Sequence, residues 1–188
     1  MFVNISWRAL VFLRKITRKE ESMKRKIFGC LSGFLILMFL MGCGSSGQYA
    51  GNDPLIFSTK TINGRSYSNY DFKDAKVVMV NFWEPWCGPC VGELPELAKL
   101  YDDYKDEGLL VIGVYSTFDM DEDAKELVNN AQIKYPVVKT TAELEAYCSE
   151  YVPTTVFFDG QGNLLSEEPI IGSNDYAGWE SIIKEYLN

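Results

Sequence analysis

The sequence predicts an α/β domain in which a central mixed β-sheet is flanked by helices and preceded by an N-terminal β-hairpin. Residues 76–83 (KVVMVNFW) and 109–115 (LLVIGVY) are apolar runs typical of strands buried on both faces of a sheet. Between them, from Cys87 to about Gly108, leucines and tyrosines recur at helical spacing, which predicts a β-α-β unit with parallel strands. A later apolar strand over 154–158 with an antiparallel return makes the predicted sheet mixed.

The hairpin is predicted at the start of the domain. Residues 55–59 and 65–68 are short candidate strands, and between them lies the dipeptide Asn63-Gly64, which is suited to a tight turn.

The second half of the chain contains the remaining predicted elements, which follow from hydrophobic spacing and turn residues. In order, they are helices over 121–131 and 142–149, a strand over 154–158, a turn over 159–163, an antiparallel return over 164–166 and a closing helix over 179–187.

Length and composition indicate one globular domain. The 188 residues have room for a single core once a targeting segment is set aside, and 47% hydrophobic and 14% aromatic residues are ordinary for a folded protein. Eight of the 18 Lys and Arg residues lie before Ile27, so the rest of the chain has 10 basic and 24 acidic residues and a formal charge of −14. This charge argues against a nucleic-acid-binding function.

The first 42 residues are predicted to be a signal peptide. A basic segment at 24–26 precedes an apolar run of 14 residues at 27–40, which is shorter than the roughly 20 residues of a membrane-spanning helix. Residues before Met23 form a second basic and apolar segment ahead of this signal, so translation is expected to start at Met23.

The end of this segment, Leu40-Met41-Gly42-Cys43, resembles a bacterial lipobox. The resemblance implies cleavage before Cys43, lipidation of its thiol and anchoring to the outer face of the cytoplasmic membrane; a plain signal peptide or an uncleaved anchor is the alternative. Residues 43–54 are polar and rich in Gly and Ser, and are predicted to be a flexible tether before a domain over 55–188.

The motif Cys87-Gly88-Pro89-Cys90 lies at the predicted strand-to-helix junction. Free N–H groups and the helix dipole at a helix N-terminus stabilise an anion, so Cys87 is expected to be the nucleophilic thiolate. Cys90, one turn into the helix, would resolve the mixed disulfide by intramolecular attack. The alternatives are half of a zinc site, which the lack of His disfavours, and a permanent structural disulfide. No metal or cofactor is expected beyond the redox-active pair.

The segment 81–90 (NFWEPWCGPC), followed by Glu93-Leu94-Pro95, resembles the active-site segment of the TlpA/ResA family of extracytoplasmic thiol-disulfide oxidoreductases. The resemblance extends over residues 55–188 and implies a thioredoxin-like fold. It implies that Pro153 is a cis-proline facing the cysteines and that Val152 before it holds an extended substrate through its backbone. Trp86 and Tyr151 are candidates for an apolar rim around the site, with ordinary packing as the alternative.

Three positions depart from simple expectation. Cytoplasmic thioredoxins have a buried aspartate where this chain has Asn81, and the resemblance implies that Glu93 accepts the Cys90 proton in its place; a solvated helix face is the alternative. Glu84 replaces a small residue and is expected to disfavour the Cys87 thiolate through its charge. Cys148 has no place in the family motif and is expected to be a buried thiol at a helix end, or else a regulatory or mispairing thiol.

The resemblance implies a membrane-anchored reductase of disulfides in exported proteins, recharged by a transmembrane electron donor of the CcdA/DsbD type. The Gly-Pro dipeptide is that of reducing thioredoxins. Apocytochrome c and an exported methionine sulfoxide reductase are the candidate substrates. A disulfide oxidase or isomerase is the alternative enzyme, and a peroxiredoxin-like antioxidant or a non-enzymatic binding lipoprotein is disfavoured.

Overall fold

The computed structural model describes residues 53–188, which form the expected α/β domain. Its five-stranded mixed sheet has the order β5-β4-β3-β6-β7. Strands β3 (Val77–Phe82), β4 (Leu109–Tyr115) and β5 (Val137–Lys139) run parallel, while β6 (Thr154–Phe158) and β7 (Ile170–Ile171) continue the sheet with antiparallel pairing. The predicted fold class is therefore confirmed.

The N-terminal hairpin is present as β1 (Ser58–Lys60) and β2 (Ser66–Ser68), which pair antiparallel. Gly64 in its turn has φ of +83°, a left-handed conformation that favours glycine. A 3-10 helix, η1 (Asn69–Phe72), connects the hairpin to β3.

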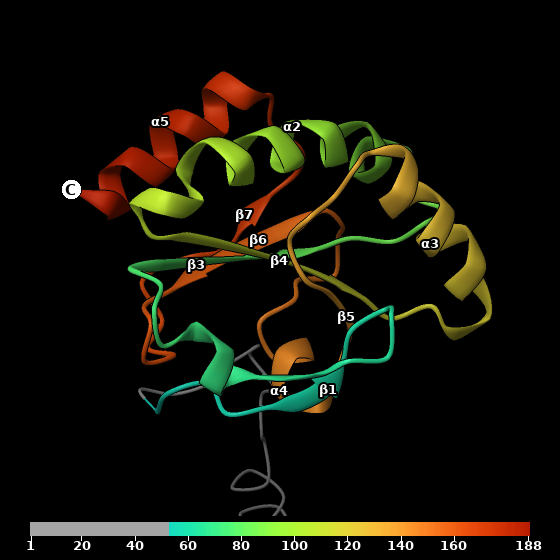
Figure 1. The fold of residues 1–188 in the computed structure, drawn as a ribbon, viewed down its shortest axis with the longest axis horizontal. Coiled ribbons are helices and arrows are strands. Elements are labelled where there is room, and N and C mark those ends of the chain that lie inside the picture. Colours follow the sequence, from blue (N-terminus) through green and yellow to red (C-terminus); the bar gives the residue numbers. More distant parts are fainter. Residues whose placement is uncertain (1–52) are drawn as a thin grey trace, which may run out of the picture. The chain divides into compact units, whose positions relative to one another are not determined.

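Helices cover both faces of the sheet (Figure 1). Helix α2 (Gly88–Tyr104), helix α3 (Asp121–Asn130) and the closing helix α5 (Tyr176–Leu187) pack on one face, whereas the short α4 (Ala142–Glu145) and the hairpin lie on the other. Single-turn helices η2 (Lys105–Glu107) and η3 (Phe118–Met120) follow α2 and precede α3.

The alternation of side chains along the central strands builds two cores. In β3, Val77 and Met79 face the layer of α2 and α5, while Val78, Val80 and Phe82 face the hairpin layer. All six residues of β3 are buried, as the continuous apolar run predicts for a strand covered on both faces.

Several element bounds differ from the sequence prediction. Strand β5 was not predicted, because three residues after a proline are too short to show a period. Helix α4 ends at Glu145 rather than at 149, and α5 begins three residues before Trp179, at Tyr176. The predicted return strand over 164–166 is only an isolated bridge from Leu164 to Phe158, and the edge strand is β7 instead.

Candidate active site

The site is built where β3 gives way to α2. Cys87 is the N-cap residue of α2, with Pro89 in the first turn, and its Sγ accepts a hydrogen bond of 3.3 Å from the backbone N–H of Cys90. Proline is tolerated there because its missing N–H would have no helical partner. The same N–H group and the helix dipole would stabilise a thiolate at Cys87 and lower its pKa after reduction.

Cys87 and Cys90 are joined in a disulfide, with their Cα atoms 5.2 Å apart. Both residues are buried, and Cys87 at 5% exposure is slightly more exposed than Cys90 at 1%, which is the order expected if Cys87 is the attacking group. Cys148 is the free cysteine within the described residues.

The peptide bond between Val152 and Pro153 is cis, in the geometry expected for this loop. The Val152 carbonyl oxygen lies 3.6 Å from Cys87 Sγ, so the loop before β6 directly faces the disulfide. Tyr151 and Trp86, which neighbour Val152 and Cys87, are 66% and 62% exposed. The structure therefore brings together the four residues predicted to contact substrate, and leaves the two aromatic rings open to solvent.

Glu93 is buried at 2% exposure, which excludes a solvated helix face. Its Oε1 accepts hydrogen bonds from Trp179 Nε1 at 2.8 Å and from the Asn174 backbone N–H at 2.7 Å, and its Oε2 accepts one of 3.2 Å from Asn81 Nδ2. Burial raises the pKa of the Glu93 carboxyl, and these three hydrogen bonds oppose the increase. The carboxyl group thus lies beside Asn81, the position at which cytoplasmic thioredoxins place their aspartate.

Glu84 has a role that the sequence did not reveal. Its carboxylate is 6% exposed, and it accepts hydrogen bonds from both residues that follow β4. Oε1 accepts from the backbone N–H of Ser116 at 2.8 Å and from the Ser116 hydroxyl. Oε2 accepts from the backbone N–H of Thr117 at 3.2 Å and from its hydroxyl at 2.5 Å. The Glu84 carboxylate, whose charge is expected to disfavour the Cys87 thiolate, is therefore also hydrogen-bonded to the loop after β4.

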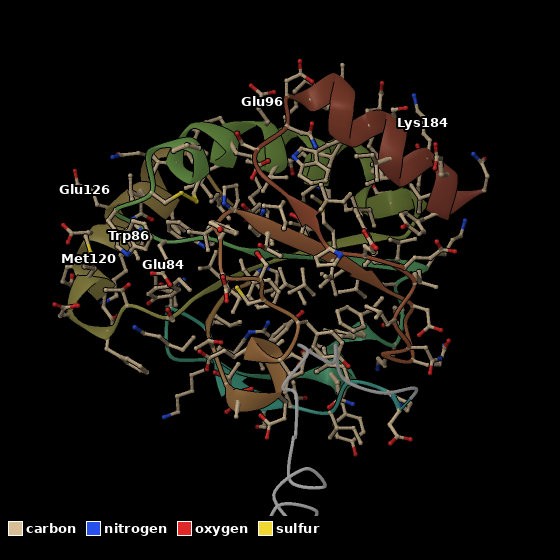
Figure 2. All side chains as sticks on the ribbon, turned by 180° about the vertical axis from the view of Figure 1, so that it is seen from behind. Glu84, Trp86, Glu96, Met120, Glu126 and Lys184 are labelled. Carbon is tan, nitrogen blue, oxygen red and sulfur yellow. A yellow bond between two sulfur atoms is a disulfide. The ribbon has the colours of Figure 1, made fainter. Side chains whose placement is uncertain are left out.

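This network extends to the rim of the site. Thr117 Oγ1 also accepts a hydrogen bond of 3.2 Å from Trp86 Nε1. Glu84 consequently fixes Thr117, and Thr117 fixes the indole beside Cys87. Figure 2 shows Glu84 and Trp86 at the same end of the domain, away from Lys184 of α5. The available sequence signal was the acidic residue at a position where the family motif has a small one.

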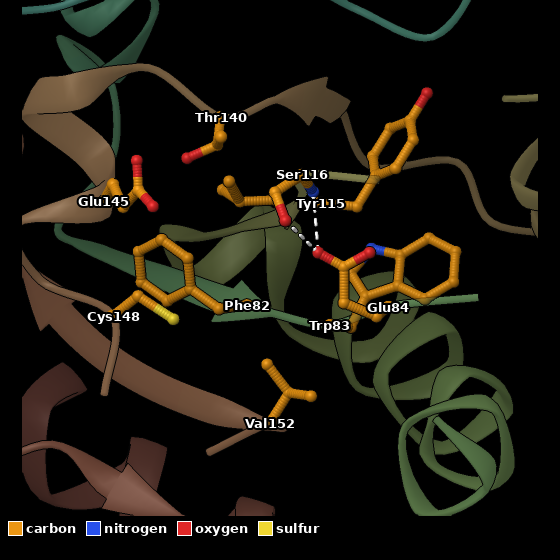
Figure 3. A pocket seen from close by; sticks show the side chains of 10 residues that line it. Phe82, Trp83, Glu84, Tyr115, Ser116, Thr140, Glu145, Cys148 and Val152 are labelled. Carbon is orange, nitrogen blue, oxygen red and sulfur yellow. Dashed lines mark hydrogen bonds between the residues drawn. The ribbon is translucent and has the colours of Figure 1, made fainter. Parts of the chain in front are cut away.

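A cavity of about 50 Å³ is lined in part by Val152 (Figure 3), and we call it the Val152 pocket. Its lining comes from the ends of β3 and β4, from α4 and the chain after it, and from the cis-proline loop. The lining residues are Phe82, Trp83, Glu84, Val114, Tyr115, Ser116, Thr140, Glu145, Cys148 and Val152.

Several predictions fall outside the described residues: the signal peptide, the lipobox with Cys43 and most of the tether. Over residues 53–188, no helix is both long enough and apolar enough to cross a membrane. The same part of the chain holds no group of three or more His, Cys, Asp or Glu side chains arranged to bind a metal ion.

Comparison with known proteins places this site in a redox family. A model of the AhpC/TSA family matches residues 51–166. The thiol-disulfide oxidoreductase ResA of Bacillus subtilis (strain 168) is 28% identical over 179 residues, which cover 88% of this chain and 93% of the relative. The ResA protein of Bacillus anthracis is 30% identical over 137 residues, covering 72% of this chain and 77% of the relative.

Solved structures agree with the fold. A thiol:disulfide interchange protein of the thioredoxin family from Chlorobium tepidum TLS matches with a TM-score of 0.64 and 26% identity over 74% of this chain and 99% of that chain. StoA from Bacillus subtilis matches with a TM-score of 0.57 and 21% identity over 73% of this chain and 100% of that chain, a likeness of fold alone.

Proposed function

Because the chain belongs to the AhpC/TSA family and is a thiol-disulfide oxidoreductase of the ResA type, we propose that it reduces disulfides in exported proteins while anchored to the outer face of the cytoplasmic membrane. The observation that carries the proposal is the Cys87–Cys90 disulfide at the N-terminus of α2, facing the carbonyl of Val152. The Gly-Pro dipeptide between the cysteines supports the reducing direction, since reducing thioredoxins share it.

The chemistry begins with the reduced pair. The Cys87 thiolate attacks one sulfur of the substrate disulfide, so that a bond from Cys87 to the substrate forms and the substrate's own S–S bond breaks. The released thiolate takes up a proton from solvent. Val152 presents its backbone to an extended substrate segment, and the rings of Trp86 and Tyr151 flank that segment.

Resolution requires the Cys90 thiol to lose its proton. We assign this proton to Glu93, which lies one helical turn further along α2 and whose pKa is raised by burial. Cys90 then attacks Cys87 Sγ, the mixed disulfide breaks, and the second substrate thiol leaves. The two electrons end on the substrate and the protein returns to the disulfide form.

Recharging requires an electron donor. We propose a transmembrane protein of the CcdA/DsbD type as that donor, and apocytochrome c or an exported methionine sulfoxide reductase as the substrate. The oxidase or isomerase alternative uses the same residues in the opposite direction. A peroxiredoxin-like reaction would need threonine three residues before the nucleophile, where this chain has Glu84 bound to the loop after β4.

The direction is tested by the reduction potential of the Cys87–Cys90 couple in the full-length protein, equilibrated against dithiothreitol or glutathione buffers. A Cys148→Ser background removes the third thiol of the described domain. A potential well below about −220 mV supports a reductase that needs a dedicated donor, whereas one near about −120 mV overturns it in favour of an oxidase.

The anchor is tested separately by labelling cells with a radioactive fatty acid. We expect the protein to incorporate label, Cys43→Ser to abolish incorporation, and Cys30→Ser, inside the signal peptide, to leave it intact. Label that persists in Cys43→Ser would overturn the lipoprotein proposal. The N-terminus of the precursor, with cleavage blocked, is expected to be Met23.

A further inference from the structure

The Val152 pocket includes the residue that is proposed to hold the substrate backbone. Val152 lines the pocket, and its carbonyl oxygen is 3.6 Å from Cys87 Sγ. An extended segment paired with the backbone at Val152 would project successive side chains to alternate sides, and the proposal below has one of them enter this cavity.

The pocket is electrically negative. Glu84 and Glu145 lie on opposite sides of it (Figure 3), and none of its lining residues is Lys or Arg. Burial, followed by the charges of Glu145 and Glu84, raises the pKa of the Cys148 thiol to about 11, as expected for a thiol between two carboxylates. Lys139 precedes Thr140 in the chain, but its ammonium group pairs with Asp121 and donates to the Thr117 carbonyl oxygen.

The two carboxylates are in different states. Glu84 is fully occupied by the four donors of Ser116 and Thr117, so it contributes charge rather than a free acceptor. Glu145 is exposed at the end of α4, and its side chain makes no hydrogen bond or ion pair among the described residues. Glu145 is therefore the group that a cation in the pocket would meet.

The remaining lining suits one kind of cation. The hydroxyls of Ser116 and Thr140 supply further acceptors, and an ammonium group has three donors to direct at them and at Glu145. Phe82, Val114 and Val152 provide an apolar surface for methylene groups. The cavity of about 50 Å³ exceeds the roughly 10–15 Å³ needed to hold one water, so it has room for an ammonium group, which is of similar size.

We propose that the Val152 pocket is a specificity site for a lysine side chain next to the reacting cysteine of the substrate, with Glu145 as its ionic partner. The substrate class is accordingly that of exported polypeptides whose disulfide lies in a lysine-containing segment. This inference rests on the proposed role of Val152 in holding the substrate backbone.

The test uses full-length reduced protein and homodimeric peptide disulfides that differ at one position. Lysine, norleucine or glutamate occupies in turn each of the two positions on either side of the cysteine, and the second-order rate constant of reduction is measured for each peptide. At one position we expect lysine to react fastest, and Glu145→Gln to lower its rate constant about three- to fivefold, with less than a twofold change for norleucine.

Glu150→Gln is the matched control, because Glu150 is also exposed, lies next to Tyr151 and does not line the pocket. It should leave the lysine preference unchanged. Equal effects of Glu145→Gln and Glu150→Gln, or norleucine reacting as fast as lysine in the unmodified protein, would overturn the proposal. The reduction potential of the Cys87–Cys90 couple tests the reductase proposal separately. If the protein proves to be an oxidase, the lysine preference can still be measured as the rate of oxidation of the corresponding peptide thiols.

Discussion

Replacing Glu84 by glutamine tests whether its carboxylate organises the active-site loops. The carboxylate accepts two hydrogen bonds at each oxygen, all from Ser116 and Thr117. In Glu84→Gln one oxygen keeps its two donors, but the new NH₂ group faces one backbone N–H and one hydroxyl. The hydroxyl can turn to accept a hydrogen bond, whereas the backbone N–H loses its acceptor.

The expected cost is the loss of one hydrogen bond to a charged acceptor, about 1.5–3 kcal/mol in the free energy of unfolding. For a domain of this size that corresponds to a fall in Tm of roughly 5–12 °C. Because Thr117 also orients Trp86, the same substitution should raise KM for a polypeptide disulfide more than it lowers kcat.

The assay is thermal unfolding of the oxidised full-length protein, together with steady-state reduction of a peptide disulfide. Glu126→Gln is the matched control, since it removes the same charge from an exposed residue of α3 whose side chain has no hydrogen-bond or ion-pair partner among residues 53–188. A Glu84→Gln protein within about 0.5 kcal/mol of Glu126→Gln would refute the reasoning, because surface substitutions fall within that range.

Three further predictions concern the cysteine pair, Glu93 and the buried core. Cys90→Ser should accumulate a mixed disulfide between Cys87 and substrate, detected by non-reducing gel electrophoresis, whereas Cys87→Ser should not; equal trapping by both variants would reverse the assigned roles. Since the folded-state pKa of Glu93 is raised, its contribution to stability is present below the unfolded value of about 4.5 and is lost as pH rises through the folded pKa. Urea unfolding across pH 4–8 should show this loss in the unmodified protein and not in Glu93→Gln. Parallel stability curves for the two proteins would contradict the burial argument. Tyr135 has a buried hydroxyl without a hydrogen-bond partner in the described structure. Tyr135→Phe should therefore leave the free energy of unfolding unchanged or raise it by up to about 1 kcal/mol. A loss of about 2 kcal/mol or more would show that the hydroxyl is hydrogen-bonded in solution.

The features predicted correctly from sequence are those encoded in contiguous residues. Strands β3 and β4 were predicted because each is a continuous apolar run, and the start of α2 because Cys87-Gly88-Pro89-Cys90 combines a cap with a proline suited to the first turn. The hairpin followed from Asn63-Gly64. In each case local propensity and the tertiary environment favour the same conformation.

The features that were missed depend on partners distant in sequence. Strand β5 is formed by its parallel pairing with Gly113 to Tyr115 of β4. Its three residues are too few to show a periodic pattern of hydrophobic residues in the sequence. The hydrogen bonds of Glu84 were not predicted, because their donors belong to Ser116 and Thr117, which lie 32 and 33 residues away in the sequence. The residues near Glu84 in the sequence give no signal for the loop whose N–H and hydroxyl groups donate hydrogen bonds to its carboxylate.

Sheet direction explains why these distant residues meet. Strands β3 and β4 run parallel, and Phe82 at the end of β3 pairs with Val114, one residue before the end of β4, so the loops that follow both strands leave the sheet at the same end. Strand β6 is antiparallel to β3 and begins at Thr154, opposite Phe82, so the cis-proline loop enters at that same edge. The disulfide, the Glu84 network and the Val152 pocket therefore lie at one end of the sheet because of the directions in which these three strands run. It follows that the sheet determines where the cysteine pair lies, while substitutions around it, at Glu84 in the loop after β3 or at Glu145 at the end of α4, are expected to change the choice of substrate without altering the fold.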